Sequence, residues 1–388
     1  MFVFISLSRV YLLSLKAPTA DVGCFFMDSW HTARPHGSRD LLTVDPLSQA
    51  VVGAAVPQSF APKQHIGTIT LLGALAGMAP DLDVLIRSST DPLLFLEYHR
   101  QFTHSFFFIP FGGLICALAF WPFVRKRMRF RYIYIVTTAG YATHGLLDAC
   151  TTYGTLLFWP FSLERIAWNT IAVIDPLFTI PLLAFIVAGV IRRSPAWPRF
   201  GLVLALCYLS VGYLQRERAE AVGELLAANR GHHDAAVSAK PTLGNVLLWK
   251  IIYRHEGRFW VDAVRVSVMG GEAQVYPGGS VAVLDRASQF PWLEDDSQQA
   301  KDLARFDWFS SGYLALDGGD PNRVIDMRYS MLPNEIDGLW GIRLNKTAGP
   351  ATHVTYEVKR SVDKTRFDNL LVMLKGQDAS SISGGDAD

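Results

Sequence analysis

Cysteine is scarce in this chain, and its placement argues against sites built from thiolates. The 388 residues include four cysteines, with no Cys-x-x-Cys pair and none after residue 207. Three of them, Cys116, Cys150 and Cys207, lie in apolar stretches. We therefore expect small buried hydrophobic side chains rather than disulfides, and a closed structural zinc site with thiolate ligands is disfavoured.

Charge is also sparse. The formal net charge is +1 and charged residues make up 18% of the chain, so nothing in the overall charge indicates a nucleic-acid partner. Half of the residues are hydrophobic, and the mean hydropathy of +0.20 is high for a soluble protein. The apolar residues are concentrated before about residue 215, which indicates a membrane domain followed by a different kind of domain.

The first 43 residues need a separate interpretation. The opening MFVFISLSRVYLLSLKAPTA loosely imitates a signal peptide, but the polar stretch after it has no pattern. We interpret residues 1–43 as an extension ahead of a start near Val44, since valine is the nominal reading of a GTG codon. A cleaved signal peptide stays open as the alternative.

Five apolar segments predict a polytopic α-helical membrane domain over residues 44–215. The second, SFFFIPFGGLICALAFWPFV, has 20 residues without a charge, the length that crosses about 30 Å of hydrocarbon. Small residues in the first segment, 66–86, suit close helix packing. An earlier apolar stretch, 44–61, is expected to lie at or partly in the membrane. The five segments, and hence about five transmembrane helices, are 66–86, 105–124, 132–150, 171–191 and 200–215.

The pattern changes after residue 215. Residues 216–240 predict a helical linker, and from 241 to 375 short β-type runs alternate with turn sequences such as YPGG and DGGD. We expect a small, mostly-β, mainly antiparallel extramembrane domain, followed by a disordered tail over 376–388.

Basic residues in the short loops predict the orientation. The loop RKRMRFR, residues 125–131, holds five basic residues, and a later loop holds Arg192, Arg193 and Arg199. Both loops should be cytoplasmic, which puts loops 87–104 and 151–170 and the C-terminal domain on the outer face of a bacterial inner membrane. Trp159, Pro160 and Trp168 would then be interfacial anchors.

Histidine and aspartate residues at the ends of these segments are the candidate metal ligands. His144 and Asp148 are four apart on a predicted helix, so they share one face. Asp81 and Asp83 would repel each other without a cation. Hydrogen bonds that tie helices together, or helix caps, are the open structural alternatives. All six candidates fall on the predicted outer side: Asp81, Asp83, His99, His104, His144 and Asp148.

Mixed histidine and carboxylate ligands suit a divalent metal, with zinc the first choice and manganese or iron as alternatives. An open site of this kind activates water, so hydrolysis is the natural reaction, with Asp83 or Asp148 as the catalytic base. Asp45 and Asp175, each before a proline, could instead be helix caps. Residues of secondary interest are Gln49, Thr103, Ser105 and Thr151, of which the last three could orient ligands, and His232 and His233, which we expect to be solvated.

Several motifs in order resemble the membrane-bound metal-dependent hydrolase family typified by the YdjM and YbcI bacterial inner-membrane proteins. They are DPLSQAVVGAAV, GMAPDLDVL, HRQFTHS, THGLLDACTTYGTLLFWPFS and IDPLFT, over residues 44–190. The resemblance implies a multi-pass membrane protein whose six candidates above bind metal. Where many members carry a histidine after the opening aspartate, this chain has Gln49, a poor metal ligand.

Three functional interpretations follow. The first is a metal-dependent hydrolase acting on a membrane lipid, or on a lipid-like or envelope substrate such as a phosphoester, with no nucleic-acid partner. The second is a noncatalytic membrane scaffold in which His–Asp pairs only hold helices together. The third is a metal transporter, which is disfavoured because the candidates gather near one face and no internal repeat is evident.

Overall fold

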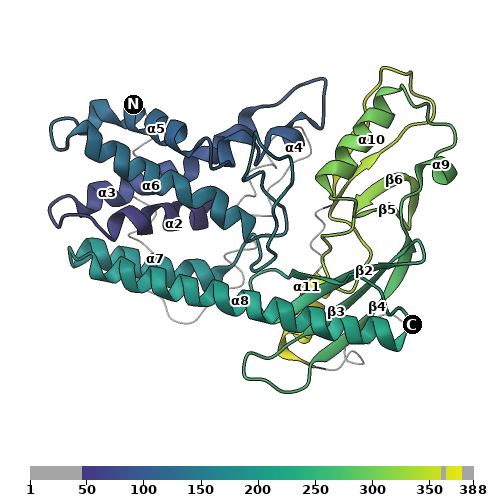
Figure 1. Ribbon diagram of the computed structural model, residues 1–388. Coiled ribbons are helices and arrows are strands. Elements are labelled where there is room, and N and C mark those ends of the chain that lie inside the picture. The colour runs from purple at the N-terminus through teal and green to yellow at the C-terminus, as the bar shows by residue number, and fades with distance from the viewer. Residues whose placement is uncertain (1–45, 360–363, 378–388) are drawn as a thin grey trace. The chain divides into compact units, whose positions relative to one another are not determined.

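The structure, a computed structural model, describes residues 46–359 and 364–377. The expected N-terminal extension and nearly all of the expected C-terminal tail lie outside these residues. Helices come first along the chain, and strands begin only after α8 (Figure 1). The elements before the strands are α2 (Pro46–Gln58), α3 (Ile66–Met78), η1 (Ala79–Leu85), α4 (Leu94–Tyr98), η2 (Phe102–His104), α5 (Ile109–Val124), α6 (Phe130–Ala149), α7 (Pro176–Ile191) and α8 (Ala196–Asn229).

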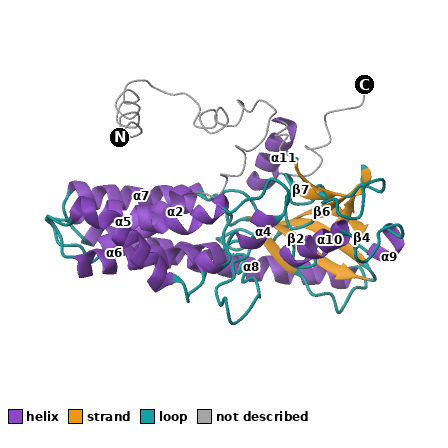
Figure 2. Ribbon diagram, turned by 90° about the horizontal axis from the view of Figure 1, so that it is seen from above, coloured by secondary structure: helices purple, strands orange, loops and turns teal. Residues whose placement is uncertain are grey.

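Helices α2, α3, α5, α6 and α7 lie side by side in a bundle with the first part of α8 (Figures 1 and 2). Glycine lets the central helices touch. A Cβ atom on Gly77 of α3 would lie 2.7 Å from the Cα of Gly53 in α2, and one on Gly140 of α6 would lie 2.6 Å from the carbonyl oxygen of Gly73. Larger side chains would force these backbones apart. The stretch 44–61, expected to lie at or partly in the membrane, therefore contributes α2 to the interior of the bundle.

Fewer helices can cross a membrane than the five we expected. Within the described residues, two are long and apolar enough, Ile66–Leu85 and Ala196–Asn229, and a bent pair, Leu94–His104 with Ile109–Val124, adds a third if it is one broken span. Helix α7 has 16 residues, or about 24 Å, which is short of the hydrocarbon thickness. Helix α6 contains Thr, Tyr, Gly, His and Asp among its apolar residues, so its mean hydropathy is too low for a membrane span.

A single helix connects the bundle to the sheets. Helix α8 runs for 34 residues without a break, so the boundary we expected at residue 215 falls inside it. Its second half packs on the first sheet, where a Cβ on Gly223 would meet Ile251. One hydrophobic cluster runs from Val51 in the bundle to Val264 in the sheet. The helical part and this sheet therefore share a core.

The C-terminal region contains two antiparallel four-stranded sheets, which confirms the expected β-rich domain. Helices α10 (Gln298–Phe309) and α11 (Lys364–Lys375) were not expected. Ser297 caps α10 by accepting from the Ala300 amide. The first sheet has the order β1 (Ser238–Pro241), β2 (Leu248–His255), β3 (Arg258–Arg265) and β4 (Gln274–Ala282), and the second β5 (Leu314–Asp317), β6 (Asp320–Asp326), β7 (Trp340–Arg343) and β8 (Thr355–Val358).

Lys250 in β2 predicts a pH dependence of stability. Its side chain is 3% exposed, and Nζ donates to Ser330 Oγ and the Glu335 carbonyl oxygen, both at 2.7 Å. Burial lowers the pKa of Lys250 from 10.5 to about 7. Between these values the unfolded chain holds a proton that the folded protein does not. The free energy of unfolding should therefore rise as the pH increases through this window, and this gain should be absent below pH 7.

The measurement is the apparent unfolding midpoint of the detergent-purified protein, followed by tryptophan fluorescence from about pH 7 to pH 9.5. We expect the midpoint to rise more with pH in the wild type than in Lys250→Met, which removes the titrating amine. Lys240 also has a pKa lowered to about 7, so only the difference between the two proteins reports on Lys250. Parallel curves would contradict the prediction.

Candidate metal centre

Three separate segments bring the candidate ligands together. Pro80 opens the short 3-10 helix η1 directly after α3, and Asp81 and Asp83 lie on it. His104 ends η2, at the bend before α5. His144 and Asp148 lie one turn apart in the last turns of α6, as their spacing predicted.

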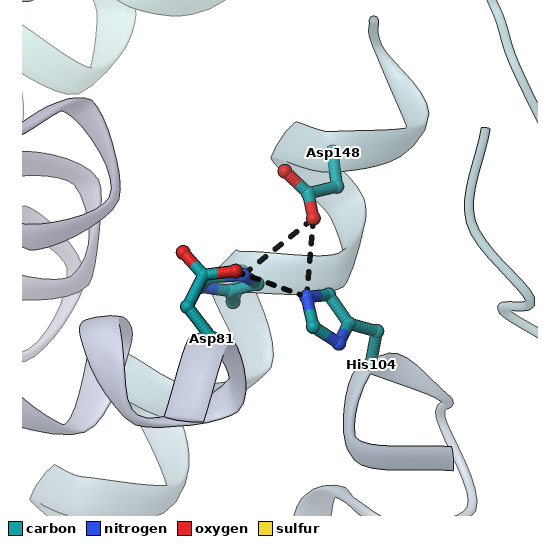
Figure 3. Close-up of side chains that lie close together, drawn as sticks. Asp81, His104 and Asp148 are labelled. Carbon is teal, nitrogen blue, oxygen red and sulfur yellow. Dashed lines mark hydrogen bonds and ion pairs between the residues drawn. The ribbon is translucent and has the colours of Figure 1, made fainter. Parts of the chain in front are cut away.

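Four side-chain atoms converge at the centre of this arrangement (Figure 3). The Nε2 atom of His104 lies 3.2 Å from Asp148 Oδ2 and 3.5 Å from Asp81 Oδ1. The Nε2 atom of His144 lies 3.2 Å from Asp81 Oδ1 and 3.5 Å from Asp148 Oδ2. A tetrahedral ion with bonds of about 2.0 Å separates its ligand atoms by about 3.3 Å. These four histidine–aspartate separations are compatible with one tetrahedral ion, and all four ligand atoms lie within 4.8 Å of one another.

The opposite ring nitrogens of both histidines are held by the protein. His144 Nδ1 donates to the carbonyl oxygen of Gly77, where α3 ends. His104 Nδ1 lies 2.9 Å from Thr103 Oγ1 and 3.2 Å from Asp83 Oδ2. With Nδ1 carrying the proton, each Nε2 presents its lone pair to the centre, which is the tautomer that metal ligation requires.

Asp83 lies behind these ligands. Its Oδ1 accepts from His99 Nδ1 at 2.8 Å, and its Oδ2 accepts from Thr103 Oγ1 at 2.8 Å and from the Arg100 amide at 3.1 Å. These contacts, with the one to His104, occupy both oxygens. Asp83 and His99 thus orient the site, although they also form a second group of potential ligand atoms with Asp81.

Asp148 is oriented by two residues from elsewhere in the chain. Gln49 of α2 donates from Nε2 to Asp148 Oδ1 at 2.8 Å, and Arg100 Nε lies 3.1 Å from Oδ2. Gln49 therefore reaches the site as a hydrogen-bond donor. Arg100 was not among the residues predicted for the site, and its only signal in the sequence is a lone basic residue beside a candidate histidine. Its guanidinium also donates to Thr151 Oγ1 at 3.0 Å.

The site is buried except at Asp81. The side chains of His104 and His144 are inaccessible and that of Asp148 is 3% exposed, whereas that of Asp81 is 16% exposed. In Figure 3 one Asp81 oxygen faces His104 and the other points away. A cavity of about 20 Å³ behind Asp148, lined in part by Gln49 and Arg100, is large enough for one water molecule. Access from outside is therefore at Asp81.

Two buried atoms at the centre lack a hydrogen-bond partner among the described residues. They are His104 Nε2 and Asp148 Oδ2, which face each other across 3.2 Å; Asp148 Oδ2 also lies 3.1 Å from Arg100 Nε, an ion pair without hydrogen-bond geometry. Buried polar atoms in native proteins are normally satisfied, so atoms left over at a point of convergence indicate a missing ligand. A divalent cation with mixed nitrogen and oxygen ligands satisfies both, so the residues present fit a metal.

Comparison with known proteins finds a family likeness over part of the chain. Residues 44–219 match the model of the YdjM inner membrane protein family. No curated protein and no solved structure matches the chain. The YdjM match covers all six candidate ligands and, together with the apolar helices, supports an inner membrane protein. It carries no information about hydrolase activity.

The other candidates lie outside the centre. Asp175 caps α7 by accepting from the Leu177 and Phe178 amides, which is the cap alternative considered above. Asp45 lies outside the described residues. His232 is not simply solvated: its ring stacks on His255 with centroids 3.9 Å apart, and Nδ1 lies 3.1 Å from Tyr253 Oη. Asp175 and His232 therefore make structural contacts away from the four converging ligand atoms.

Proposed function

We propose that this protein is a membrane-bound metal-dependent hydrolase that holds one divalent cation, with zinc the first choice. The ligands would be Asp81, His104, His144 and Asp148. One observation carries the proposal: both histidines have Nδ1 engaged by protein acceptors, and both direct Nε2 toward two carboxylate oxygens at 3.2–3.5 Å.

The orphaned atoms argue against a purely structural role. If the His–Asp pairs served only to hold helices together, both of the 3.2 Å contacts at the centre should be hydrogen bonds, as the one between His144 Nε2 and Asp81 Oδ1 is. His104 Nε2 and Asp148 Oδ2 instead face each other without one. A scaffold would have no reason to keep two such atoms buried, because an unmade hydrogen bond costs about 1–3 kcal/mol.

The surrounding residues either hold the metal ligands in position or can take part in the reaction. Gln49 and Arg100 fix the carboxylate of Asp148, and Asp83 fixes the ring of His104, so neither carboxylate is free to move. Asp81 alone is open to solvent, and we assign its outward oxygen as the proton acceptor in place of Asp83 or Asp148. A bound divalent cation would supply the Lewis acidity that polarises an ester and makes water nucleophilic.

The membrane setting supports an amphiphilic substrate. The bundle that holds the site belongs to the segment matching an inner-membrane family, and two or three of its helices are apolar enough to span a bilayer. We propose a lipid or lipid-linked ester as substrate, with a phosphoester preferred. The five basic residues of loop 125–131 support a cytoplasmic position for that loop, an outer-face opening for the site and an extracytoplasmic C-terminal domain.

The test is hydrolysis by the full-length protein in detergent micelles containing phospholipid or a chromogenic phosphoester. We expect activity with zinc or manganese that chelation removes, and a loss of at least about 100-fold in Asp81→Asn, because a general base contributes on this scale. Asp234→Asn, which alters an exposed aspartate in the turn after α8, is the matched control. Activity that survives chelation, or that Asp81→Asn leaves intact, would refute the mechanism.

One observation favours transport as a second candidate. His99 and His104 lie in the segment before the 88° bend to α5, and transporters bind ions at broken helices. Metal uptake by proteoliposomes without hydrolysis would support this candidate instead.

A further inference from the structure

A second cavity, of about 400 Å³, lies beside loop 151–170 and is distinct from the metal centre. The loop, strand β1, the residues just before β5 and those just after β6 line it. Its volume falls in the range of small-molecule sites. The residues that matter to the argument are Arg165, Trp168, Asn169, Lys240, Tyr313 and Arg328.

The cavity collects positive charge that the protein does not neutralise. Arg328 is paired with Asp326, Nη2 to Oδ2 at 2.7 Å. Arg165 and Lys240 have no ion pair among the described residues. The one acidic residue that lines the cavity, Glu164, is exposed and forms no ion pair with either of them.

Both unpaired cations also have unused donors. Arg165 donates from Nη2 to the Gly154 carbonyl oxygen at 3.0 Å, but its buried Nε and Nη1 atoms find no acceptor within the described part of the chain. Lys240 is 7% exposed, and its nearest acceptor, Asn169 Oδ1, is 3.5 Å from Nζ, at the limit for a hydrogen bond. Buried charges are normally paired, so this arrangement lacks an anion.

The electrostatics agree with the contacts. Burial and the neighbouring Arg328 lower the pKa of Lys240 to about 7. Burial lowers the pKa of Arg165 to about 10. Burial outweighs the attraction that Glu220 and Asp326 exert on Lys240, and a bound anion would raise the pKa of both cations.

The cavity and the metal centre are close together, because an arginine beside each of them contacts the same Tyr153 ring. Arg100, which contacts Asp148, lies over the Tyr153 ring with Cζ 4.6 Å from its centroid, and Arg165 Cζ lies 5.4 Å from the same centroid. Thr152, which lines the cavity, follows Asp148 by four residues. On the open side Trp168 is 42% exposed, offering an aromatic surface to an attached group.

We propose that this cavity binds a phosphate group, with Arg165 and Lys240 as its direct contacts. Arginine forks and lysine ammonium groups are the usual protein donors to phosphate oxygens. The group could belong to a lipid headgroup or to a water-soluble phosphoester. Its assignment to the substrate rests on the proposed hydrolase function, whereas the binding itself does not.

The experiment measures binding of inorganic phosphate to the full-length, detergent-purified protein by equilibrium dialysis with EDTA present, so that no metal contributes. We expect saturable binding by the wild type, and affinity at least about tenfold lower in Lys240→Met and in Arg165→Met, since each removes a charge-assisted contact. Arg258→Met, which removes an exposed cation from the hairpin end of β3, should bind as the wild type does.

Two further arms separate the possible outcomes. Tighter competition by dihexanoyl phosphatidic acid than by glycerol 3-phosphate would support a lipid headgroup as the source, and equal competition a soluble phosphoester. The His144→Ala/Asp148→Ala variant should still bind phosphate, so the cavity stands even if the hydrolase proposal fails. Absence of saturable binding by the wild type, or unchanged affinity in both cavity variants, would overturn the proposal.

Discussion

Wild-type protein reconstituted with zinc is expected to retain about one ion per chain after dialysis, and the His144→Ala/Asp148→Ala variant is expected to retain none. The variant removes one imidazole and one carboxylate of the four converging ligands, leaving two groups from different segments. Two ligands alone should bind the ion too weakly to retain it during dialysis. Elemental mass spectrometry on the two proteins, purified side by side, gives the answer, with manganese and iron tested in the same way.

Two further variants make this result specific. His232→Ala removes a histidine that stacks on His255 and should leave the metal content unchanged. Asp83→Asn keeps the shape of the side chain that supports His99 and His104, and should weaken metal affinity by about 10–100-fold without abolishing it. A wild type that holds none of the three metals, or a double variant that holds as much as the wild type, would refute the metal centre.

Replacing Gly77 by valine is expected to have the largest effect on stability. A Cβ atom there would lie 2.7 Å from both the Gln49 carbonyl oxygen and the Gly53 Cα, and neither backbone atom can move aside. Overpacking against backbone should cost on the order of 3 kcal/mol. The same displacement moves the carbonyl that holds His144 Nδ1, so Gly77→Val should lower both the unfolding midpoint and the metal content.

Gly67→Ala is the matched control, because a Cβ there meets only Val190 Cγ1 at 3.9 Å. Its unfolding midpoint, measured in the same detergent, should equal or slightly exceed that of the wild type, because alanine favours a helix more than glycine does. A Gly77→Val protein that melts and binds metal normally would show that α2 and α3 are not held as closely as described.

The candidate ligands could be found from sequence because their types and spacing are local. His144 and Asp148 share a helix face by periodicity alone, and Asp81 with Asp83 form a charged pair in an apolar run. The sequence alone did not distinguish the residues that would bind a metal from those that hold these ligands in position. Whether Asp83 binds or supports depends on Arg100, Thr103 and His104 reaching it across a bend, and the contact between Gln49 and Asp148 spans 99 positions.

The fold was predicted in outline for similar reasons. Alternation and turn sequences are local signals, and they indicated the antiparallel strands. The number of spans was wrong because an apolar segment need not form a helix that is long or apolar enough to cross a bilayer: α7 has 16 residues, and α6 carries Thr, Tyr, Gly, His and Asp among its apolar residues. The unbroken α8 was missed because its sequence changes from apolar to polar at residue 215 while helical propensity continues through both halves.

The length of helix α8 also places loop 151–170 relative to the bilayer. The 20 residues from Ala196 to Gln215 extend roughly 30 Å, which equals the hydrocarbon thickness. The next residue, Arg216, donates from Nη1 to the Trp168 carbonyl oxygen at 2.6 Å. If the first 20 residues fill the hydrocarbon, loop 151–170 lies at headgroup level. A lipid-anchored substrate could then be cleaved while its acyl chains stay in the bilayer. The choice among such substrates would depend on the distance between the bond that is cleaved and the acyl chains.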